Sequence, residues 1–432
     1  MTGGHWQNWS GWVSCAPRSI EEPRTEAELS KVVRHSVGPV RVAGSGHSFT
    51  PLVETDGTII KLDSLNGVGD ADLSTREIDI WGGTKIADLG IPLKELGLAL
   101  ANQGDIDQQS ITGAIGTGTH GTGRALGSLS TQVASFRLVT ATGDVLNCSP
   151  TENIDVFKGG RVSLGALGVM SQVRLRCRPA YKLEEHIWPM DANHCLKRLE
   201  AFDEANRHFE FFWFPFANHV IAKTLNETDK TAPEPRAPEM RSTRKAENRV
   251  FQLACETGRF LPFLKPSLQR YLTSASGEAK RVRWSCEAFP SPRTVLFNEM
   301  EFAVPAEKGA DCVREIAAYI RRRNLNVMFP IEFRRVAEDD IWLSPFYERP
   351  SVTISVHQYA KQKYRKFFDG CEAIFRSYGG RPHWGKLHSF TAKDFESLYD
   401  RWDDFRDMRE RLDPDGKFLN PYLKTIFDGG SR

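Results

Sequence analysis

The chain has 432 residues, enough for two or three domains at roughly 150 residues per domain. With 57 basic and 55 acidic residues its net charge is +2, which argues against nucleic-acid binding, because that function needs a clustered basic excess. The eight cysteines are scattered without a C-x-x-C pair, so the sequence indicates neither a zinc site nor a disulfide framework. We therefore expect small-molecule ligands and no bound metal.

The start of the chain and its hydropathy bear on location. The N-terminal stretch MTGGHWQNWSGW lacks a basic start followed by an apolar run. No stretch approaches the roughly 18 consecutive apolar residues of a transmembrane helix. Scattered cysteines are typical of a reducing compartment. The sequence therefore predicts a cytoplasmic protein without a transmembrane segment.

The first part of the chain alternates short strands and helices. Thr25 and Glu28 have the spacing of a capping box, which predicts a helix that begins there. Short strands are expected at 40–43, 57–62 and 78–83, and apolar residues at helical spacing predict a helix over 86–98. This alternation predicts a mixed α+β domain.

A glycine-rich turn follows the strand at 40–43, in the stretch VRVAGSGHSF. Gly44 and Gly46 can adopt dihedral angles that a Cβ forbids, and they let a ligand approach the backbone. Successive amide groups in such a turn favour an anion such as a diphosphate. His47 would then lie beside the bound ligand. The alternative is an ordinary turn in which His47 makes local hydrogen bonds.

A second glycine-rich stretch, 102–123, reads NQGDIDQQSITGAIGTGTHGTG. Its glycines let the backbone lie against a flat or phosphorylated ligand, and its serine and threonine hydroxyls can donate hydrogen bonds. The alternative is a loop that simply packs tightly. A third stretch, 163–175, turns through two glycines into an apolar strand suited to a buried position beside the same ligand.

These segments, which include GSGHSF at 44–49, GTGTHGTG at 116–123 and SLGALGVMSQVRL at 163–175, together resemble the FAD-binding domain of the vanillyl-alcohol oxidase flavoprotein family. The likeness covers residues 15–180. It implies an α+β domain of two subdomains, with FAD between them and its diphosphate on the first turn. The dinucleotide fold is not indicated, because no G-x-G-x-x-G helix entrance opens the chain.

The same resemblance implies which residues contact the cofactor. Family members with a histidine at the place of His47 commonly carry the flavin covalently through its 8α-methyl group, so we expect that link here. The cofactor contacts that the resemblance implies are Arg41, Ala43, Gly44, Ser45, Gly46, His47, Ser48, Gly104, Asp105, Ser110, Gly113, Thr117, Gly118, Thr119, His120, Val173, His383 and Lys386.

From about residue 182 the composition changes. An aromatic run at 208–216 has the period of a strand, and further strands are expected at 295–304, 327–336 and 351–359. Apolar residues at helical spacing follow two of these strands, which predicts a sheet with helices on one side. The segment 229–249 is rich in proline and charge, so we expect a solvated loop there.

Two strands and one turn of this part carry candidate catalytic side chains. Strand geometry places Glu332 and Arg334 on one face, where a carboxylate and a guanidinium could hold vicinal hydroxyls. His357 shares a face with other polar residues of its strand, and the turn RPHWGK presents His383 and Lys386. The alternative is an exposed polar face with a surface ion pair, and a surface loop.

This half also resembles one branch of that family, the sugar-1,4-lactone and alditol oxidoreductases, through IEFR at 331–334, HWGK at 383–386 and DPDGKFLNPYL at 413–423. In that branch the equivalents of Glu332 and Arg334 hold the substrate hydroxyls, and a lysine at the place of Lys386 lies by the flavin pyrimidine. Residues 181–432 are therefore expected to form an α+β substrate domain, a mainly antiparallel sheet covered by helices, whose C-terminal segment returns to the flavin. The expected catalytic residues are Glu332, Arg334, His357 and Lys386.

Two positions leave the activity open. Gly104 aligns with the position that gates oxygen in the family, and a small residue there is expected to admit O2. The next residue, often serine in the branch, is Asp105, whose carboxylate could face the substrate or the flavin. The substrate preference of that branch therefore cannot be transferred directly to this chain.

The expected function is FAD-dependent oxidation of a sugar-1,4-lactone of the gulono, galactono or arabinono type, by hydride transfer to flavin N5. The product would be an enediol lactone such as ascorbate, and O2 or another acceptor would take the electrons. An alditol or carbohydrate primary-alcohol oxidase is the alternative, because both substrate classes offer vicinal hydroxyls to Glu332 and Arg334. A FAD-binding protein without catalysis is a further alternative.

Overall fold

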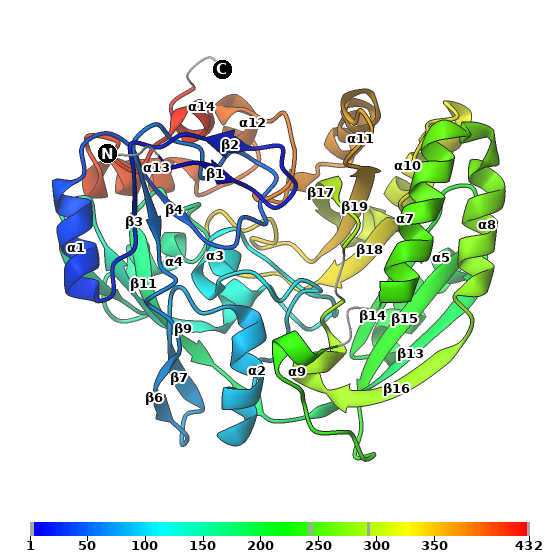
Figure 1. The fold of residues 1–432 in the computed structure, drawn as a ribbon, viewed down its shortest axis with the longest axis horizontal. Helices are drawn as coiled ribbons and strands as arrows, with labels where there is room; N and C mark the ends of the chain where they lie inside the picture. The colour runs from blue at the N-terminus through cyan, green and yellow to red at the C-terminus, as the bar shows by residue number, and fades with distance from the viewer. Residues whose placement is uncertain (1–3, 242–244, 292–293, 430–432) are drawn as a thin grey trace.

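The computed structural model describes residues 4–241, 245–291 and 294–429, and its strands form two separate regions (Figure 1). In the first region a parallel sheet has the order β3-β5-β4, and an antiparallel sheet has the order β10-β9-β11-β7-β6. The bounds are β3 Ser19–Glu21, β4 Val40–Ala43, β5 Thr58–Lys61, β6 Val68–Asp72, β7 Glu77–Trp81, β9 Val133–Val139, β10 Val145–Cys148 and β11 Val169–Arg176. A small hairpin, β1 Trp6–Gln7 with β2 Ser14–Cys15, precedes them.

Helix α1 (Glu26–His35) begins where the capping residues predict. The Thr25 side chain accepts a hydrogen bond from the Glu28 amide at 3.1 Å. Its buried residues Leu29 and Val33 pack against the parallel sheet in a small core that also contains Phe418. The other helices of this region are α2 Ile86–Glu95, α3 Ile111–Gly116 and α4 Ile154–Gly160, with the short η1 Leu129–Gln132.

The helix expected over 86–98 ends earlier than its apolar spacing suggests. Helix α2 stops at Glu95, and Gly97 has a φ of +73° that a continuing helix cannot contain. Leu98 and Ala99 instead form β8, which pairs with β12 (Arg178–Pro179). The prediction was therefore wrong at the C-terminal end of this helix.

The second region is built on one antiparallel sheet of order β16-β13-β15-β14-β18-β19-β17-β20. The strand expected at 351–359 is confirmed as β19 (Ser351–Tyr359), and the expected α+β architecture with a mainly antiparallel second sheet is confirmed. The remaining bounds are β13 Lys182–Asp191, β14 His208–Trp213, β15 His219–Glu227, β16 Ala279–Trp284, β17 Phe297–Pro305, β18 Ile331–Val336 and β20 Arg381–Pro382.

The two faces of this sheet differ in chemistry. One face contributes Phe211, Phe302, Phe333 and Ile354 to the main core, which helices α10 (Gly309–Arg322) and α11 (Arg365–Ser377) help to cover. The opposite face carries the charged residues described below. Helices α5 (Ala192–Lys197), α6 (Leu199–Ala205) and α9 (Ser285–Ala288), with the short η4 (Ala306–Lys308), complete the elements around the sheet.

Helices α7 (Lys245–Phe260) and α8 (Lys265–Ala275) form a hairpin at the right-hand edge of Figure 1, joined by η3 (Pro262–Leu264). The loop expected over 229–249 therefore ends sooner, because residues from Lys245 onward are helical. Residues 229–241 have no regular structure apart from η2 (Pro238–Met240), and 242–244 lie outside the described residues.

The C-terminal helices return to the first region, where Figure 1 shows them beside β1 to β4. They are α12 (Ala392–Glu396), α13 (Trp402–Leu412) and α14 (Pro421–Phe427). The Val40 amide donates to the Lys417 carbonyl at 2.8 Å, and the Asn420 side chain donates to the carbonyls of Pro51 and Glu54, both at 2.8 Å. The chain end thus fixes the strand that leads into the first glycine-rich turn.

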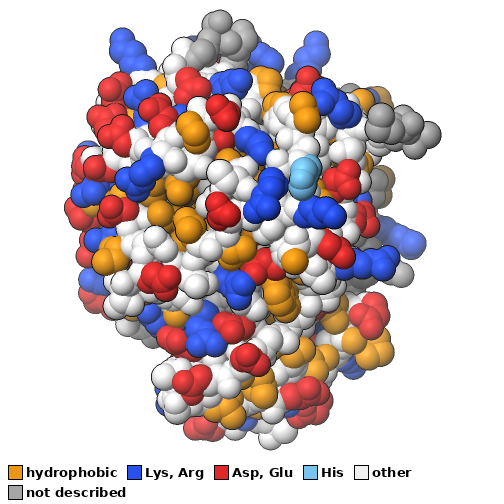
Figure 2. Space-filling model, turned by 90° about the vertical axis from the view of Figure 1, so that its left-hand side faces the viewer, with side chains coloured by type: hydrophobic (Ala, Val, Ile, Leu, Met, Phe, Trp, Pro, Cys, Tyr) orange, Lys and Arg blue, Asp and Glu red, His pale blue; other side chains and the backbone are white. Residues whose placement is uncertain are grey.

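None of the eight cysteines, all within the described residues, forms a disulfide. Among the described helices, none combines the length and the apolar character needed to cross a bilayer. On the side of the molecule that carries α1, acidic and basic side chains are interspersed (Figure 2), as the near balance of charge in the sequence predicts.

Candidate active site

A glycine-lined cavity of about 1120 Å³, partly open to solvent, lies in the first region. It reaches from the end of β4 to the loop before β11 and to the start of α3. Its glycines are Gly44, Gly46, Gly82, Gly83, Gly113, Gly116, Gly165 and Gly168. The three glycine-rich segments of the sequence therefore meet around one space.

The turn after β4 shows why this space needs glycine. Gly46 has a φ of +70°, in the left-handed region that other residues adopt only under strain. A Cβ on Gly44 would lie 2.3 Å from the hydroxyl oxygen of Ser110, at the entrance of α3. The backbone itself therefore forms the wall here, and a ligand in the cavity can approach it closely.

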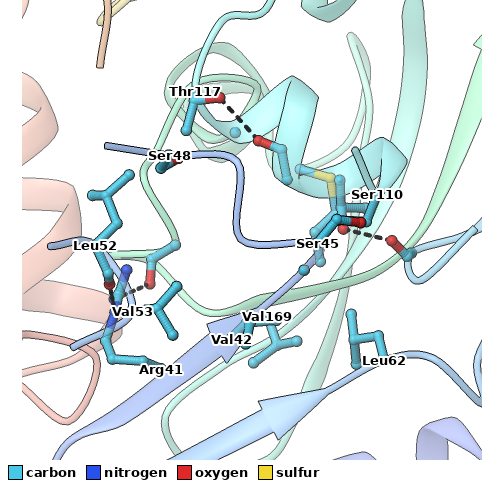
Figure 3. Close-up of a pocket in the computed structure, with 18 of the residues that line it drawn as sticks. Arg41, Val42, Ser45, Ser48, Leu52, Val53, Leu62, Ser110, Thr117 and Val169 are labelled. Atoms are coloured by element: carbon cyan, nitrogen blue, oxygen red, sulfur yellow. Dashed lines mark hydrogen bonds between the residues drawn. The ribbon is translucent and has the colours of Figure 1, made fainter. Parts of the chain in front are cut away.

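Arg41 ties the loops of this cavity together. Its Nε donates to the Leu52 carbonyl at 2.6 Å (Figure 3). Its terminal nitrogens donate to the carbonyls of Leu164, Gly165 and Phe418. Burial lowers the pKa of Arg41 to about 10. Since its donors are engaged by backbone carbonyls, Arg41 holds the walls of the cavity in place.

The structure brings most of the expected cofactor contacts to this cavity. Those lining it are Arg41, Ala43, Gly44, Ser45, Gly46, His47, Ser48, Ser110, Gly113 and Thr117. Gly118 and Val173 line neither this cavity nor the pocket beside it. Val173 is fully buried in the main core, where it pairs with Ile80 of β7, so it supports the wall from behind.

A second, charged pocket of about 690 Å³ lies against the large sheet. It shares His47, Ser48, Gln109 and Thr117 with the glycine-lined cavity, so the two spaces meet at His47. The expected site residues that line it are Gly104, Asp105, Thr119, His120, Glu332, Arg334, His383 and Lys386, in addition to the shared ones.

His47 lies at this junction as a neutral imidazole. Burial, followed by the positive charges of Lys386 and Lys85, lowers the pKa of His47 to about 4. Its ring lies 5.7 Å from the indole of Trp9, measured between centroids. At neutral pH the ring therefore keeps a lone pair available for bonding.

Arg334 stands among three carboxylates. Its Nη2 lies 2.7 Å from Asp105 Oδ2 and 3.1 Å from Glu332 Oε2, and its Nε donates to Glu210 Oε2 at 2.8 Å. The register explains this, because Glu210 of β14 faces Arg334 of β18 directly. Burial would lower the pKa of Arg334, but Asp105, Glu332 and Glu210 hold it well above its usual value.

Lys386 approaches the pocket from the turn after β20 and pairs with Glu299 of β17 at 2.5 Å. The same Glu299 lies 3.5 Å from His357 Nε2. Burial alone would raise the pKa of Glu299, but Lys386 and His357 hold it well below its usual value. A fixed ammonium and a fixed carboxylate therefore border the pocket at this end.

Glu301, one pleat further along β17, lies between two imidazoles. His120 contacts the Gly121 carbonyl at 2.8 Å and Glu301 Oε1 at 2.7 Å, so both of its ring nitrogens face acceptors and a proton lies between His120 and Glu301. Burial opposes ionisation, yet the contact with His120 holds the pKa of Glu301 well below its usual value.

His383 completes this cluster as a neutral ring. Its Nδ1 accepts the Gly385 amide at 3.0 Å, so the proton of the neutral ring is on Nε2. Burial lowers the pKa of His383 to about 4. The ligand atoms of His120, Glu301 and His383 lie within 4.8 Å of one another, as a metal site requires. In this structure the His120 ring contacts Glu301, and the His383 ring accepts the Gly385 amide.

His357 does not line the charged pocket. It lines an aromatic chamber behind Glu332, formed by Phe212, Phe214, Phe251 and Phe329. Its Nε2 is buried without a hydrogen-bond partner among the described residues, and it lies 3.9 Å from Glu332 Oε1. His357 is therefore placed to act through Glu332 and Glu299.

Sequence reasoning missed three acidic residues: Glu299 and Glu301, which line the pocket, and Glu210, which pairs with Arg334. Each belongs to a strand whose other residues are largely apolar. Glu299 and Glu301 occupy alternate positions in FNEMEF, so they share a face of β17. Buried carboxylates in an apolar strand require partners, and that pattern was the available signal.

The residues present fit FAD. A Cβ-free wall of backbone suits a flat ring and a diphosphate, and the charged pocket begins where this wall ends at His47. The turn at 44–48, with Ser110, Gly113 and Thr117, would hold the cofactor. The cations Arg334 and Lys386 would lie at its reacting end.

Comparison with known protein families agrees with this geometry. Residues 173–426 match the family described as D-arabinono-1,4-lactone oxidase, and residues 17–149 match the family described as FAD binding domain. The chain is 42% identical to L-gulono-1,4-lactone dehydrogenase from Mycobacterium tuberculosis over 425 residues, 98% of each chain. It is 33% identical to L-gulonolactone oxidase from Mus musculus, again over 98% of each chain.

A more distant relative is an alditol oxidase from a Streptomyces species, 28% identical over 98% of this chain and 99% of that protein. Among solved structures, a solvent-stable cholesterol oxidase has a TM-score of 0.82 over 98% of this chain and 97% of its own, at 18% identity. At that identity the likeness concerns the fold, which is that of the vanillyl-alcohol oxidase flavoproteins.

Proposed function

The chain belongs to the D-arabinono-1,4-lactone oxidase family of FAD-linked oxidoreductases, and from this premise we propose that it oxidises a secondary carbinol of a sugar-1,4-lactone. The proposed substrates are gulono-, galactono- or arabinono-1,4-lactones, and the product is an enediol lactone such as ascorbate. The observation that carries the proposal is the pair of cations, Arg334 and Lys386, in a pocket that meets the glycine-lined cavity at His47.

We assign residues 15–180 to FAD binding and residues 181–432 to substrate binding. In support, the glycine-lined cavity is built from the first part of the chain, and the acids and Arg334 of the charged pocket come chiefly from the large sheet. The returning C-terminal segment supports β4 and its turn. The absence of disulfides among the eight cysteines supports a reducing, cytoplasmic location.

In this proposal Glu332 and Arg334 orient two neighbouring hydroxyls of the substrate. Bound FAD supplies the acceptor for the hydride of the carbinol C–H. Glu332 takes the hydroxyl proton, and His357, 3.9 Å behind it, receives that proton next. Arg334 and Lys386 stabilise the negative charge that develops as the proton leaves, an effect worth about 3 kcal/mol for one well-placed donor.

We further propose that His47 holds the flavin covalently. The support is its neutral ring at the junction of the two spaces. Protein precipitated with acid should stay yellow, and His47→Ala should release its flavin into the supernatant. His35→Ala, which alters an exposed histidine of α1, is the matched control and should stay yellow. Free FAD from acid-precipitated wild type would show the link to be wrong.

The electron acceptor is proposed to be O2 or a second acceptor that reaches the reduced flavin past Gly104. Gly104 lines the charged pocket, and a Cβ there would lie 3.0 Å from the His120 carbonyl. The lack of a side chain at Gly104 supports access for a small molecule at this edge of the pocket.

Oxidation of a primary alcohol in an alditol is the second candidate. The acids around Arg334 favour neutral hydroxylated ligands of either class. Steady-state turnover on a panel of L-gulono-1,4-lactone, other aldonolactones and xylitol separates the candidates. We expect the largest kcat/KM for a lactone. Turnover of xylitol with no activity on any lactone would replace the first proposal by the second.

A further inference from the structure

The outer surface of the α7–α8 hairpin is strongly apolar. Phe260 and Phe263 at its tip are 69% and 73% exposed, and Leu253 on the outer face of α7 is 69% exposed. Val250, Leu261 and Tyr271 are further exposed apolar residues of the hairpin. Large side chains gathered in this way usually mark a surface that binds a partner.

The inner face of the same hairpin packs against the protein core. Ala254 and Cys255 of α7 are buried in a cluster with Phe297 and Phe329, and Phe251 lines the aromatic chamber. Helix α7 is therefore apolar on two sides, although only one side meets the protein core. An amphipathic surface helix needs only one such face, so the outer face requires a separate explanation.

Basic residues accompany this apolar surface. From Arg249 to Ser276 the only acidic residue is Glu256, which is paired with Arg259 and Lys361, whereas Arg249 and Arg270 are exposed. The surface therefore combines exposed aromatic and aliphatic side chains with positive charge.

The end of α10 adds more positive charge beside the hairpin tip. Lys265 Nζ donates to the Asn324 carbonyl at 3.0 Å, and the Asn326 side chain donates to the Gly258 carbonyl at 3.0 Å. These bonds hold the segment after α10 against the end of α7 and the start of α8. The exposed arginines 321–323 directly precede Asn324.

We propose that the α7–α8 hairpin docks the enzyme on the surface of an anionic lipid bilayer. The side chains of Phe260, Leu261 and Phe263 enter the interface between headgroups and acyl chains, and the surrounding arginines contact the phosphates. This combination of an aromatic tip and a basic rim is typical of interfacial membrane binding. A protein partner would more often meet a flatter apolar patch with a polar rim of both charges.

The test is co-sedimentation of the purified holoenzyme with vesicles, which needs no catalytic assay. We expect the enzyme to bind vesicles of phosphatidylcholine mixed with phosphatidylglycerol, and to bind phosphatidylcholine alone far less. Phe260→Ser/Phe263→Ser should lower the partition coefficient by about tenfold or more, since each buried Phe contributes strongly to transfer. Arg322→Gln/Arg323→Gln should lower it about tenfold, and added salt should do the same for wild type.

The matched control is Leu73→Ser, which removes another exposed apolar side chain, 57% exposed, at the end of β6 in the first region. It should leave vesicle binding unchanged. Flavin content and thermal unfolding of each variant report whether the fold is intact. Equal binding of wild type and the Phe variant, or no binding to the anionic vesicles, would overturn the proposal. Self-association of wild type that the Phe variant abolishes, without vesicle binding, would assign the hairpin to a contact between copies.

Discussion

The two spaces that meet at His47 are built in opposite ways. The glycine-lined cavity is formed mainly by the backbone of several short turns, and Arg41 engages backbone carbonyls around it. The charged pocket is formed chiefly by side chains from β17, β18 and several loops, and Arg334 is surrounded there by Asp105, Glu210 and Glu332.

This difference determines what each space tolerates. A wall of backbone is damaged by an added Cβ or by strain in φ, whereas its neighbours can exchange side chains of similar size. A wall of paired charges is damaged when one partner loses its charge, because the others then remain buried without compensation. Mutations of the two kinds should therefore separate cofactor loading from catalysis.

The largest effect is expected from Gly46→Val in the wall of the glycine-lined cavity. A β-branched residue at φ +70° is strained by about 1–2 kcal/mol, and the shift of this turn also displaces His47. We expect a folded protein that carries almost no flavin and has no activity. Flavin absorbance per polypeptide measures this.

Gly97→Val is the matched control for that substitution. Gly97 has a similar φ of +73°, and a Cβ there meets no atom within 4 Å. Its variant should lose similar stability and keep its flavin. If both variants retained flavin equally, the turn at 44–46 would not be the cofactor-binding wall.

The next largest effect is expected from Arg334→Gln in the charged pocket. Loss of the guanidinium should lower kcat/KM by about 100- to 1000-fold, as for removal of one preorganised charge-stabilising donor, while flavin content stays near wild type. Arg335→Gln alters the neighbouring arginine on the other face of β18 and should change kcat/KM little. A variant Arg334→Gln that kept wild-type kcat/KM would remove this residue from the mechanism.

A smaller and more selective effect is expected at the boundary of the pocket. In Gly104→Ala the new methyl group lies 3.0 Å from the His120 carbonyl and narrows the approach to the reacting end. Reoxidation of the reduced enzyme by O2 should slow several-fold, with reduction by substrate largely intact. Stopped-flow measurement of the two half-reactions separates them, and unchanged O2 kinetics would reject the role of Gly104.

The smallest effect concerns a buried carboxylate outside both spaces. Burial raises the pKa of Asp203 to about 7, although Arg335 lies 3.6 Å away. Because its pKa is raised on folding, Asp203 reduces stability as the pH rises from its unfolded value of 3.8 through 7. Glu301, with closer partners, has a lowered pKa.

Asp203→Asn should therefore gain stability relative to wild type as the pH rises over that range, and the gain should level off above pH 7. Denaturant unfolding at several pH values measures it. A difference that is constant with pH would show that partners, and not burial, set the charge of Asp203.

Local patterns in the sequence predicted the glycine-lined cavity well. The glycine-rich segments, His47 and the entrance of α1 at Thr25 are each encoded within a few residues, so their geometry could be inferred before the fold. The end of α2 could not, because the apolar spacing continues to Leu98 although Gly97 turns the chain.

The charged pocket was predicted only in part, because its charged side chains come from different strands and loops. Glu332 and Arg334 are neighbours on one strand and were found, whereas sheet register alone places Glu210 opposite Arg334 and Glu299 opposite His357. His357 shares the charged face but opens into the aromatic chamber, a placement that depends on α7. The apolar outer surface of the α7–α8 hairpin also went unrecognised, since side-chain exposure is a property of the whole fold.

The most direct test of the account is anaerobic addition of L-gulono-1,4-lactone to the purified yellow enzyme while the flavin absorbance is recorded. We predict that the flavin band bleaches in wild type, and that it bleaches far more slowly in Arg334→Gln at equal flavin content. A flavin band that stays unchanged with this and every other aldonolactone and alditol tested, in a protein that carries its full flavin, would contradict the account.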